Sequence, residues 1–175
     1  EQAACWGFGA VAYSNLEFRI NGFWSARTNQ LTSPSLNSCW IKTPWIIPGN
    51  GDLTMKARLE NASGTTRGIA FSYIPYDPNA PTSYKEGTPV TYSTYNFATP
   101  LDIWVKNISI PLPAVIANSQ NPYKILISFI GTGGNSRMFA DDIVIPGTYW
   151  SDPSNGCLPL PTIQDVDLDG VADAD

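Results

Sequence analysis

The pattern of apolar and polar residues indicates β-strands along most of the chain. Leu53, Met55, Ala57 and Leu59 alternate with polar residues, which is the two-residue period of a strand with one buried face. Turn residues separate such segments, for example in the run from Pro48 to Gly51. The run 123–130 is the most apolar and is expected to be central. The predicted strands cover residues 16–20, 39–47, 53–59, 68–74, 90–97, 103–110, 123–130 and 138–145.

Composition supports the same class of fold. Aromatic residues make up 12% of the 175 residues, glycine and proline are abundant, and no segment has a convincing helical period. We therefore predict an all-β sandwich of about eight antiparallel strands over residues 1–146. Residues 147–164 are expected to be a linker packed against this domain, and residues 165–175 begin an irregular acidic segment.

The acidic segment has the spacing of a calcium-binding loop. Calcium takes six to eight oxygen ligands, and such loops place carboxylates at alternate positions with a glycine, here Gly170, at the sharp turn. The segment resembles the start of a thrombospondin type 3 repeat; a dockerin, half of an EF-hand and a solvated acidic tail are the alternatives. Such repeats stiffen stalks in secreted proteins, so the resemblance implies an extracellular protein that continues beyond residue 175. The expected ligands are Asp165, Asp167, Asp169, the carbonyl of Val171, and Asp173.

Charge and composition argue against several functions. The net charge is -5, and five of the fifteen acidic residues lie in the last eleven positions, which leaves ten acidic residues against ten basic ones elsewhere. The charges are therefore balanced outside the last eleven positions, and no stripe of basic residues indicates nucleic-acid binding. No apolar run approaches the ~18 residues of a membrane-spanning helix. Histidine, the commonest general base, is absent. We expect a protein that is not an enzyme.

Three short motifs resemble those of bacterial surface jelly-roll domains of the cleaved-adhesin and MAM-like kind. They are Leu16-Glu-Phe18, Trp40-Ile-Lys-Thr-Pro44 and Ala140-Asp-Asp-Ile-Val144. The resemblance implies a jelly-roll β-sandwich whose first and last strands are neighbours. It also implies that Glu17 shares a structural Ca²⁺ with Asp142 or its neighbour Asp141. The alternative is that the inward-facing aspartate caps backbone N–H groups at a turn.

Three cysteines allow three pairings. If the first and last strands are antiparallel, Cys5 and Cys157 emerge at the same end of the domain and could form a disulfide bond, which leaves Cys39 buried with a free thiol. Three buried thiols are the alternative.

Aromatic loops suggest a binding surface for sugars. Sugar rings stack on aromatic side chains while their hydroxyl groups bond to polar ones, and residues 75–89 form a long loop rich in tyrosine and proline. We therefore expect a secreted or cell-surface adhesin domain that binds an extracellular glycan. A protein–protein assembly domain that recognises a surface protein and a purely structural cap are the alternatives. The expected ligand-binding residues are Tyr76, Asp77, Asn79, Tyr84, Trp24 and Arg27.

Calorimetry with Ca²⁺ tests both proposed metal sites. We expect the intact chain to bind Ca²⁺, and removal of residues 165–175 to abolish the part of the signal that belongs to the repeat. Binding that persists in the shortened chain supports the site at Glu17 and Asp142. The absence of any Ca²⁺ binding by the intact chain would contradict both sites.

Overall fold

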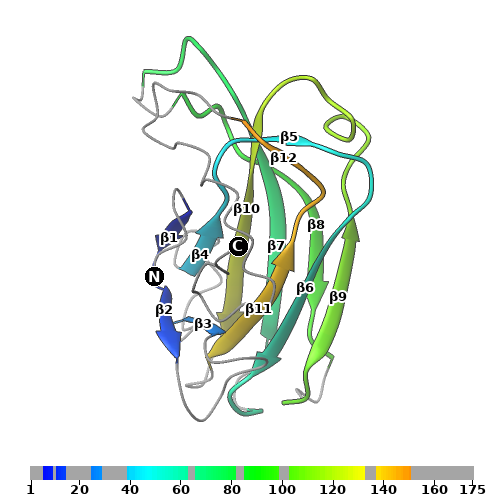
Figure 1. Ribbon diagram of the computed structural model, residues 1–175. Helices are drawn as coiled ribbons and strands as arrows, with labels where there is room; N and C mark the ends of the chain where they lie inside the picture. The colour runs from blue at the N-terminus through cyan, green and yellow to red at the C-terminus, as the bar shows by residue number, and fades with distance from the viewer. Residues whose placement is uncertain are drawn as a thin grey trace, which may run out of the picture.

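The chain folds as a β-sandwich. The computed structural model describes residues 6–9, 11–14, 25–28, 39–62, 66–81, 85–98, 103–132 and 137–150. Within these ranges it forms twelve β-strands in two antiparallel sheets that lie face to face (Figure 1). This arrangement confirms the predicted all-β class. None of the described segments is a helix long and apolar enough to span a bilayer.

The larger sheet is organised around its central strand, β10. This strand pairs with β7 along its whole length on one edge, and with β4 and then β5 on the other. β1 extends the sheet beyond β4, β8 extends it beyond β7, and β12 pairs with β5. The apolar run that we expected to be central therefore is central. In the described residues this seven-stranded sheet contains β1 (Gly7–Gly9), β4 (Cys39–Lys42), β5 (Ile46–Pro48), β7 (Thr66–Pro75), β8 (Val90–Asn96), β10 (Tyr123–Thr132) and β12 (Gly147–Tyr149).

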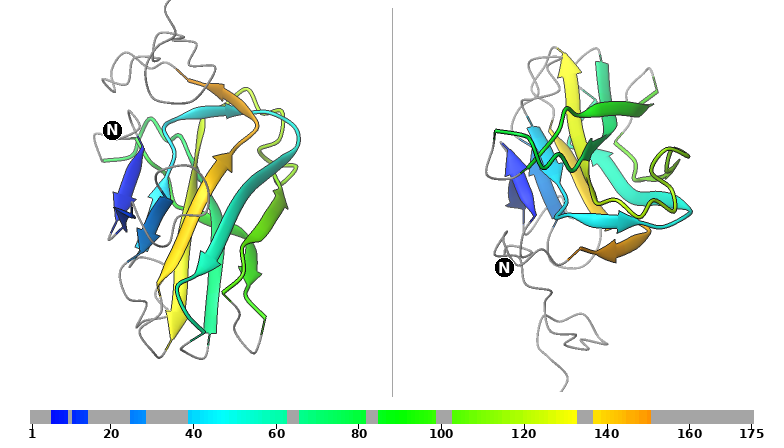
Figure 2. Two further views of the ribbon diagram at one scale, coloured as in Figure 1. Left: turned by 60° about the horizontal axis from the view of Figure 1, so that its bottom comes forward. Right: turned by 90° about the horizontal axis from the view of Figure 1, so that it is seen from above.

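The smaller sheet lies against the first and has the order β2-β3-β11-β6-β9. β3 therefore lies beside the late strand β11, and β2 pairs with the other edge of β3. The predicted first strand, residues 16–20, lies outside the described residues. Figure 2 shows the two layers from other directions, with β5 and β12 crossing one end of the sandwich. In the described residues this five-stranded sheet contains β2 (Val11–Ser14), β3 (Ser25–Thr28), β6 (Asp52–Leu59), β9 (Lys106–Pro111) and β11 (Met138–Val144).

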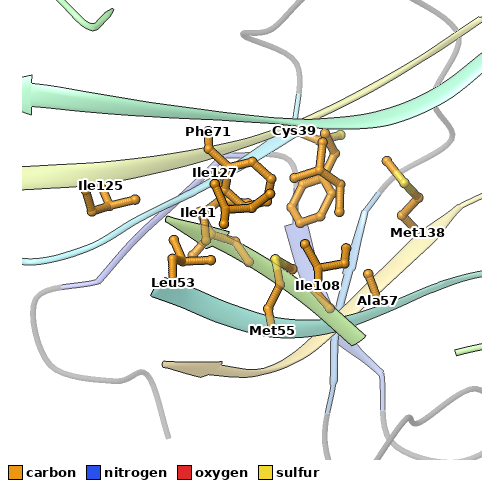
Figure 3. Close-up of a cluster of buried hydrophobic side chains, with 14 of the residues drawn as sticks. Cys39, Ile41, Leu53, Met55, Ala57, Phe71, Ile108, Ile125, Ile127 and Met138 are labelled. Atoms are coloured by element: carbon orange, nitrogen blue, oxygen red, sulfur yellow. The ribbon is translucent and has the colours of Figure 1, made fainter. Parts of the chain in front are cut away.

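The core fills the space between the sheets, and each strand contributes every second side chain to it. The alternation predicted for residues 53–59 is confirmed, because its apolar residues are buried and its polar ones are half-buried or exposed. Cys39 is buried in the same cluster, as expected. Figure 3 shows these side chains meeting between the two layers. The labelled residues are Cys39, Ile41, Leu53, Met55, Ala57, Phe71, Ile108, Ile125, Ile127 and Met138.

Two predicted strands differ in extent from those observed. Residues 39–47 divide into β4 and β5, because Pro44 cannot donate a ladder hydrogen bond. Thr43, between the two strands, stays bonded to β10. Its hydroxyl oxygen accepts the amide of Ile125 at 2.8 Å, and its amide donates to the carbonyl of Ile125 at 2.9 Å. The strand predicted over 103–110 begins only at Lys106. The segment expected to be a packed linker starts with β12.

Gly147 illustrates how tightly β12 is held. Its φ of +142° is unfavourable for other residues, and an added Cβ would collide with the carbonyl oxygen of Ile47 and approach the nitrogen of Gly49 to 3.1 Å. Gly51 has a similar φ of +129°, but its Cβ would meet nothing closer than Pro146 at 3.7 Å.

We expect Gly147→Ala to lower the free energy of unfolding by about 3 kcal/mol or more, since it adds a backbone collision to the conformational strain. Gly51→Ala carries the strain alone and should cost about 1–2 kcal/mol. Urea denaturation of the two variants measures both values. Equal losses would contradict the close packing of β12 on β5.

Candidate functional site

The outer face of the seven-stranded sheet carries both charged and aromatic residues. Ile41 and Ile125 point into the core, so their neighbours Trp40, Lys42 and Lys124 face away from it. The middle of this face is not accessible to solvent. Ala70, Ser72 and Ser128 face away from the core there, but all three are buried. The charged and aromatic side chains gather toward the end of the sheet that β5 and β12 cross.

The long loop after β7 folds back on itself at this end. Tyr76 pairs with Glu86 in an isolated antiparallel bridge, and the amide of Asp77 donates to the carbonyl of Lys85 at 2.8 Å. The amide of Tyr76 also donates to the carbonyl of Pro122 at 3.2 Å. The described part of the loop is thus an extension of the sheet, which places the side chain of Glu86 over β4 and β10.

Glu86 joins two lysines from different strands. Lys42 Nζ donates to its two carboxylate oxygens at 2.8 and 2.9 Å, and Lys124 Nζ donates to Oε1 at 2.8 Å. Burial raises the pKa of the Glu86 carboxyl, but the hydrogen bonds and charges of Lys124 and Lys42 outweigh burial and lower it overall. The lowered pKa keeps the Glu86 carboxylate ionised at neutral pH between the two lysines.

Three aromatic rings lie beside this charge cluster. Tyr76 contacts Trp45 and Trp150 edge to face, with ring centroids 5.4 and 5.1 Å away, and the two tryptophans are 6.4 Å apart. Lys124 Nζ lies 4.8 Å from the centre of the Trp45 ring, a favourable cation–π distance. Trp150 is also tied by its backbone, since its amide donates to the carbonyl of Trp45 at 3.0 Å.

Trp45 carries an unused donor. Its side chain is only 4% exposed, and its buried indole nitrogen has no hydrogen-bond partner among the described residues. A buried N–H group without a partner costs about 1–3 kcal/mol, so this donor lowers the stability of the cluster. Tyr76 and Trp150 are half-buried and keep part of each ring accessible.

The predicted binding residues do not all lie together. Tyr76 belongs to the cluster and is half-buried. Asp77 shapes the adjacent turn, since its Oδ1 accepts the amide of Asn79 at 2.8 Å. Arg27 lies on β3, in the five-stranded sheet, opposite Phe139 of β11. Trp24 and Tyr84 fall outside the described residues.

Sequence reasoning did not select the residues that complete the cluster. The alternation of β4 would have assigned Lys42 to the outer face, but nothing local connects it with Glu86, which lies 44 positions further along the chain. The same holds for Trp45 and Trp150, which tertiary pairing of β5 with β12 brings together. The residues missed were Lys42, Trp45, Glu86, Lys124 and Trp150.

The proposed metal ligands are mostly outside the described part of the chain. Of them, only Asp142 is described: it lies at an irregularity of β11 with a φ of +49°, and its carboxylate contacts Lys56 Nζ at 2.6 Å. Asp141 Oδ1 accepts the amide of Asp142 at 2.9 Å. No group of three or more potential metal-ligating acidic or cysteine side chains occurs in the described ranges. The remaining ligands, Glu17, Asp165, Asp167, Asp169, Val171 and Asp173, and the cysteines Cys5 and Cys157, lie outside those ranges.

Comparison with known proteins identifies the fold. No protein-family model matches the chain, and no curated protein matches it in sequence. A carbohydrate-binding module of family 28, specific for non-crystalline cellulose, is similar in structure with a TM-score of 0.50 and 14% identity, over 82% of this chain and 89% of that one. A family 61 module solved with β-1,4-galactotriose gives 0.49 at 15% identity, over 81% of this chain and 88% of that one. A xylan-binding family 22 module from Paenibacillus barcinonensis gives 0.49 at 11% identity, over 83% of this chain and 87% of that one.

We expect Glu86→Gln to lower the free energy of unfolding at pH 7 by about 1–2 kcal/mol, because the buried Lys124 and the half-buried Lys42 lose their counter-charge. The native pKa of Glu86 is lowered, so its contribution is present above the pKa of the unfolded chain and is lost as the pH falls through the native value. The difference between wild type and variant should therefore shrink below about pH 4. Urea denaturation across this range measures it.

Glu60→Gln is the matched control. Glu60 is similarly exposed but pairs with a single cation, Arg137, at 3.1 Å. We expect a smaller loss for this variant. A Glu86→Gln variant as stable as wild type at pH 7 would show that the charge cluster does not stabilise the loop.

Proposed function

We propose that this chain is a non-catalytic glycan-binding domain. The observation that carries the proposal is the cluster at one end of the seven-stranded sheet, where the half-buried rings of Tyr76 and Trp150 pack on Trp45 beside the ion-pair network of Lys42, Glu86 and Lys124. Aromatic rings offer flat faces for the C–H groups of a sugar, and the ammonium and carboxylate groups can bond to hydroxyl groups.

The electrostatics of the cluster favour binding over catalysis. A general acid in glycoside hydrolysis needs a carboxyl with a raised pKa and a second carboxylate across the scissile bond. The pKa of Glu86 is instead lowered, and its nearest charged neighbours are lysines. The fold shared with the family 28 cellulose-binding module gives further support, because that protein uses such a sandwich to bind a polysaccharide.

The proposal also includes a Ca²⁺-binding segment and an extracellular location. The acidic run from Asp165 to Asp175 would bind Ca²⁺ and lead into a stiff stalk, which would make the sandwich the head of a secreted or cell-surface adhesin. Polysaccharides accessible to such a head are extracellular.

We expect Tyr76→Ala to weaken polysaccharide binding by about tenfold or more, equivalent to ~1.4 kcal/mol, because it removes one ring face and opens the packing around Trp45. Affinity electrophoresis in gels with hydroxyethyl cellulose, xylan or galactan measures this loss. Tyr95→Ala is the control, since Tyr95 is also half-buried and packs edge to face on one ring, that of Phe97, but lies on β8 away from the cluster.

Thermal unfolding of both variants separates lost binding from lost folding. If wild-type protein binds no polysaccharide in a broad glycan array and instead retains a surface protein from cell extracts, the glycan proposal is wrong and the assembly function is favoured. If Tyr76→Ala folds and binds polysaccharide like wild type, the ligand lies elsewhere on the molecule.

A further inference from the structure

An exposed apolar tip stands at the opposite end of the sandwich from the charge cluster. Trp104 is 74% exposed, and its neighbours Ile103 and Val105 are 44% and 42% exposed. The tip directly precedes β9, and its first paired residue, Lys106, lies opposite Ala57 near the end of β6. β5 and β12 cross the other end, as Figures 1 and 2 show.

A tryptophan this exposed contributes little to folding. Large aromatic side chains usually supply core energy, and four other described tryptophans, Trp6, Trp40, Trp45 and Trp150, are buried or half-buried. The largest exposed apolar patch of a monomer is commonly a few hundred Å² and often functional.

The size of the tip selects the kind of ligand. One ring and two aliphatic side chains offer a few hundred Å² at most, whereas a stable protein–protein interface needs about 800 Å² from each partner. A single flat ring of this size matches one face of a sugar ring. The exposed amide of Asn107, on the adjacent strand β9, can bond to hydroxyl groups.

We infer that Trp104 is the platform of a second glycan-binding patch, which contacts the same class of polysaccharide as the first site. This inference rests on the proposed function for the class of ligand. Strands of ten residues such as β7 and β10 run between the two ends, so the patches are roughly 30 Å apart. A long polymer can reach both patches, and a short oligosaccharide can reach only one.

Two patches on one domain change the affinity for polymers. When one patch has bound a polysaccharide chain, the rest of that chain is held at a high local concentration near the second patch. The apparent affinity of the domain for the polysaccharide therefore rises without any new contact in the first site. Loss of Trp104 should therefore weaken binding to long chains and leave binding of short oligosaccharides at the first site unchanged.

The test compares variants on two probes, a soluble polysaccharide that wild type binds and a short oligosaccharide of the same sugar. We expect Trp104→Ala to weaken polysaccharide binding by about tenfold and to leave oligosaccharide affinity within twofold of wild type. Trp104→Tyr keeps a ring and should retain most of the binding. Val115→Ala is the matched control, because it removes a 64%-exposed apolar side chain elsewhere and should have no effect.

Three outcomes would overturn the inference while leaving the first site intact. One is a Trp104→Ala variant that binds polysaccharide like wild type. Another is an indole N–H signal of Trp104 that does not shift when polysaccharide is added to ¹⁵N-labelled protein. The third is a self-associating wild type that Trp104→Ala converts to a monomer, which would make the tip an interface between copies. Failure of wild type to bind any polysaccharide would instead reject the proposed function.

Discussion

The pairing of β10 on both of its edges is the constraint on which the rest of the structure depends. One edge pairs along ten residues with β7, and the other is shared by β4 and β5. Because partners lie on both edges of β10 between Tyr123 and Phe129, its register determines where the side chains of each partner lie. Ile125, Ile127 and Phe129 consequently face the core, and the residues between them face outward.

The outward-facing side chains of β10 include Lys124, which belongs to the candidate site. Lys124 lies directly beside Ile125, so its direction follows from the burial of its neighbour. The break at Thr43 and Pro44, which keeps β4 and β5 on the same edge of β10, brings Lys42 and Trp45 next to it. The loop from Tyr76 to Glu86 then supplies the carboxylate that both lysines require. A half-buried ammonium group needs such a partner, because desolvation without one is costly.

The aromatic residues divide by role according to their surroundings. Phe71 and Phe129 fill the core, while Trp45, Tyr76 and Trp150 pack edge to face at one end of the outer surface. Trp104 alone among the described tryptophans is mostly exposed. The sandwich therefore carries partly exposed aromatic side chains at both ends, separated by the length of its strands.

The sequence by itself determined the class of fold and the buried face of its regular strands, because the two-residue alternation of Leu53 to Leu59 is a local property. It also predicted a calcium-binding repeat over residues 165–175, whose proposed ligands are neighbours in the chain. The sequence pointed to Tyr76, because it lies in a loop rich in aromatic residues, but it did not identify the residues around Tyr76. Those residues come from four segments between residues 42 and 150. A local pattern predicts which face of a strand a side chain occupies, but it does not predict which strand lies beside it. Only the tertiary pairing of β10, β5 and β12 decided that Lys42, Lys124 and Glu86 share one charge network and that Trp45 and Trp150 enclose Tyr76, since register and strand order arise from packing the whole core at once.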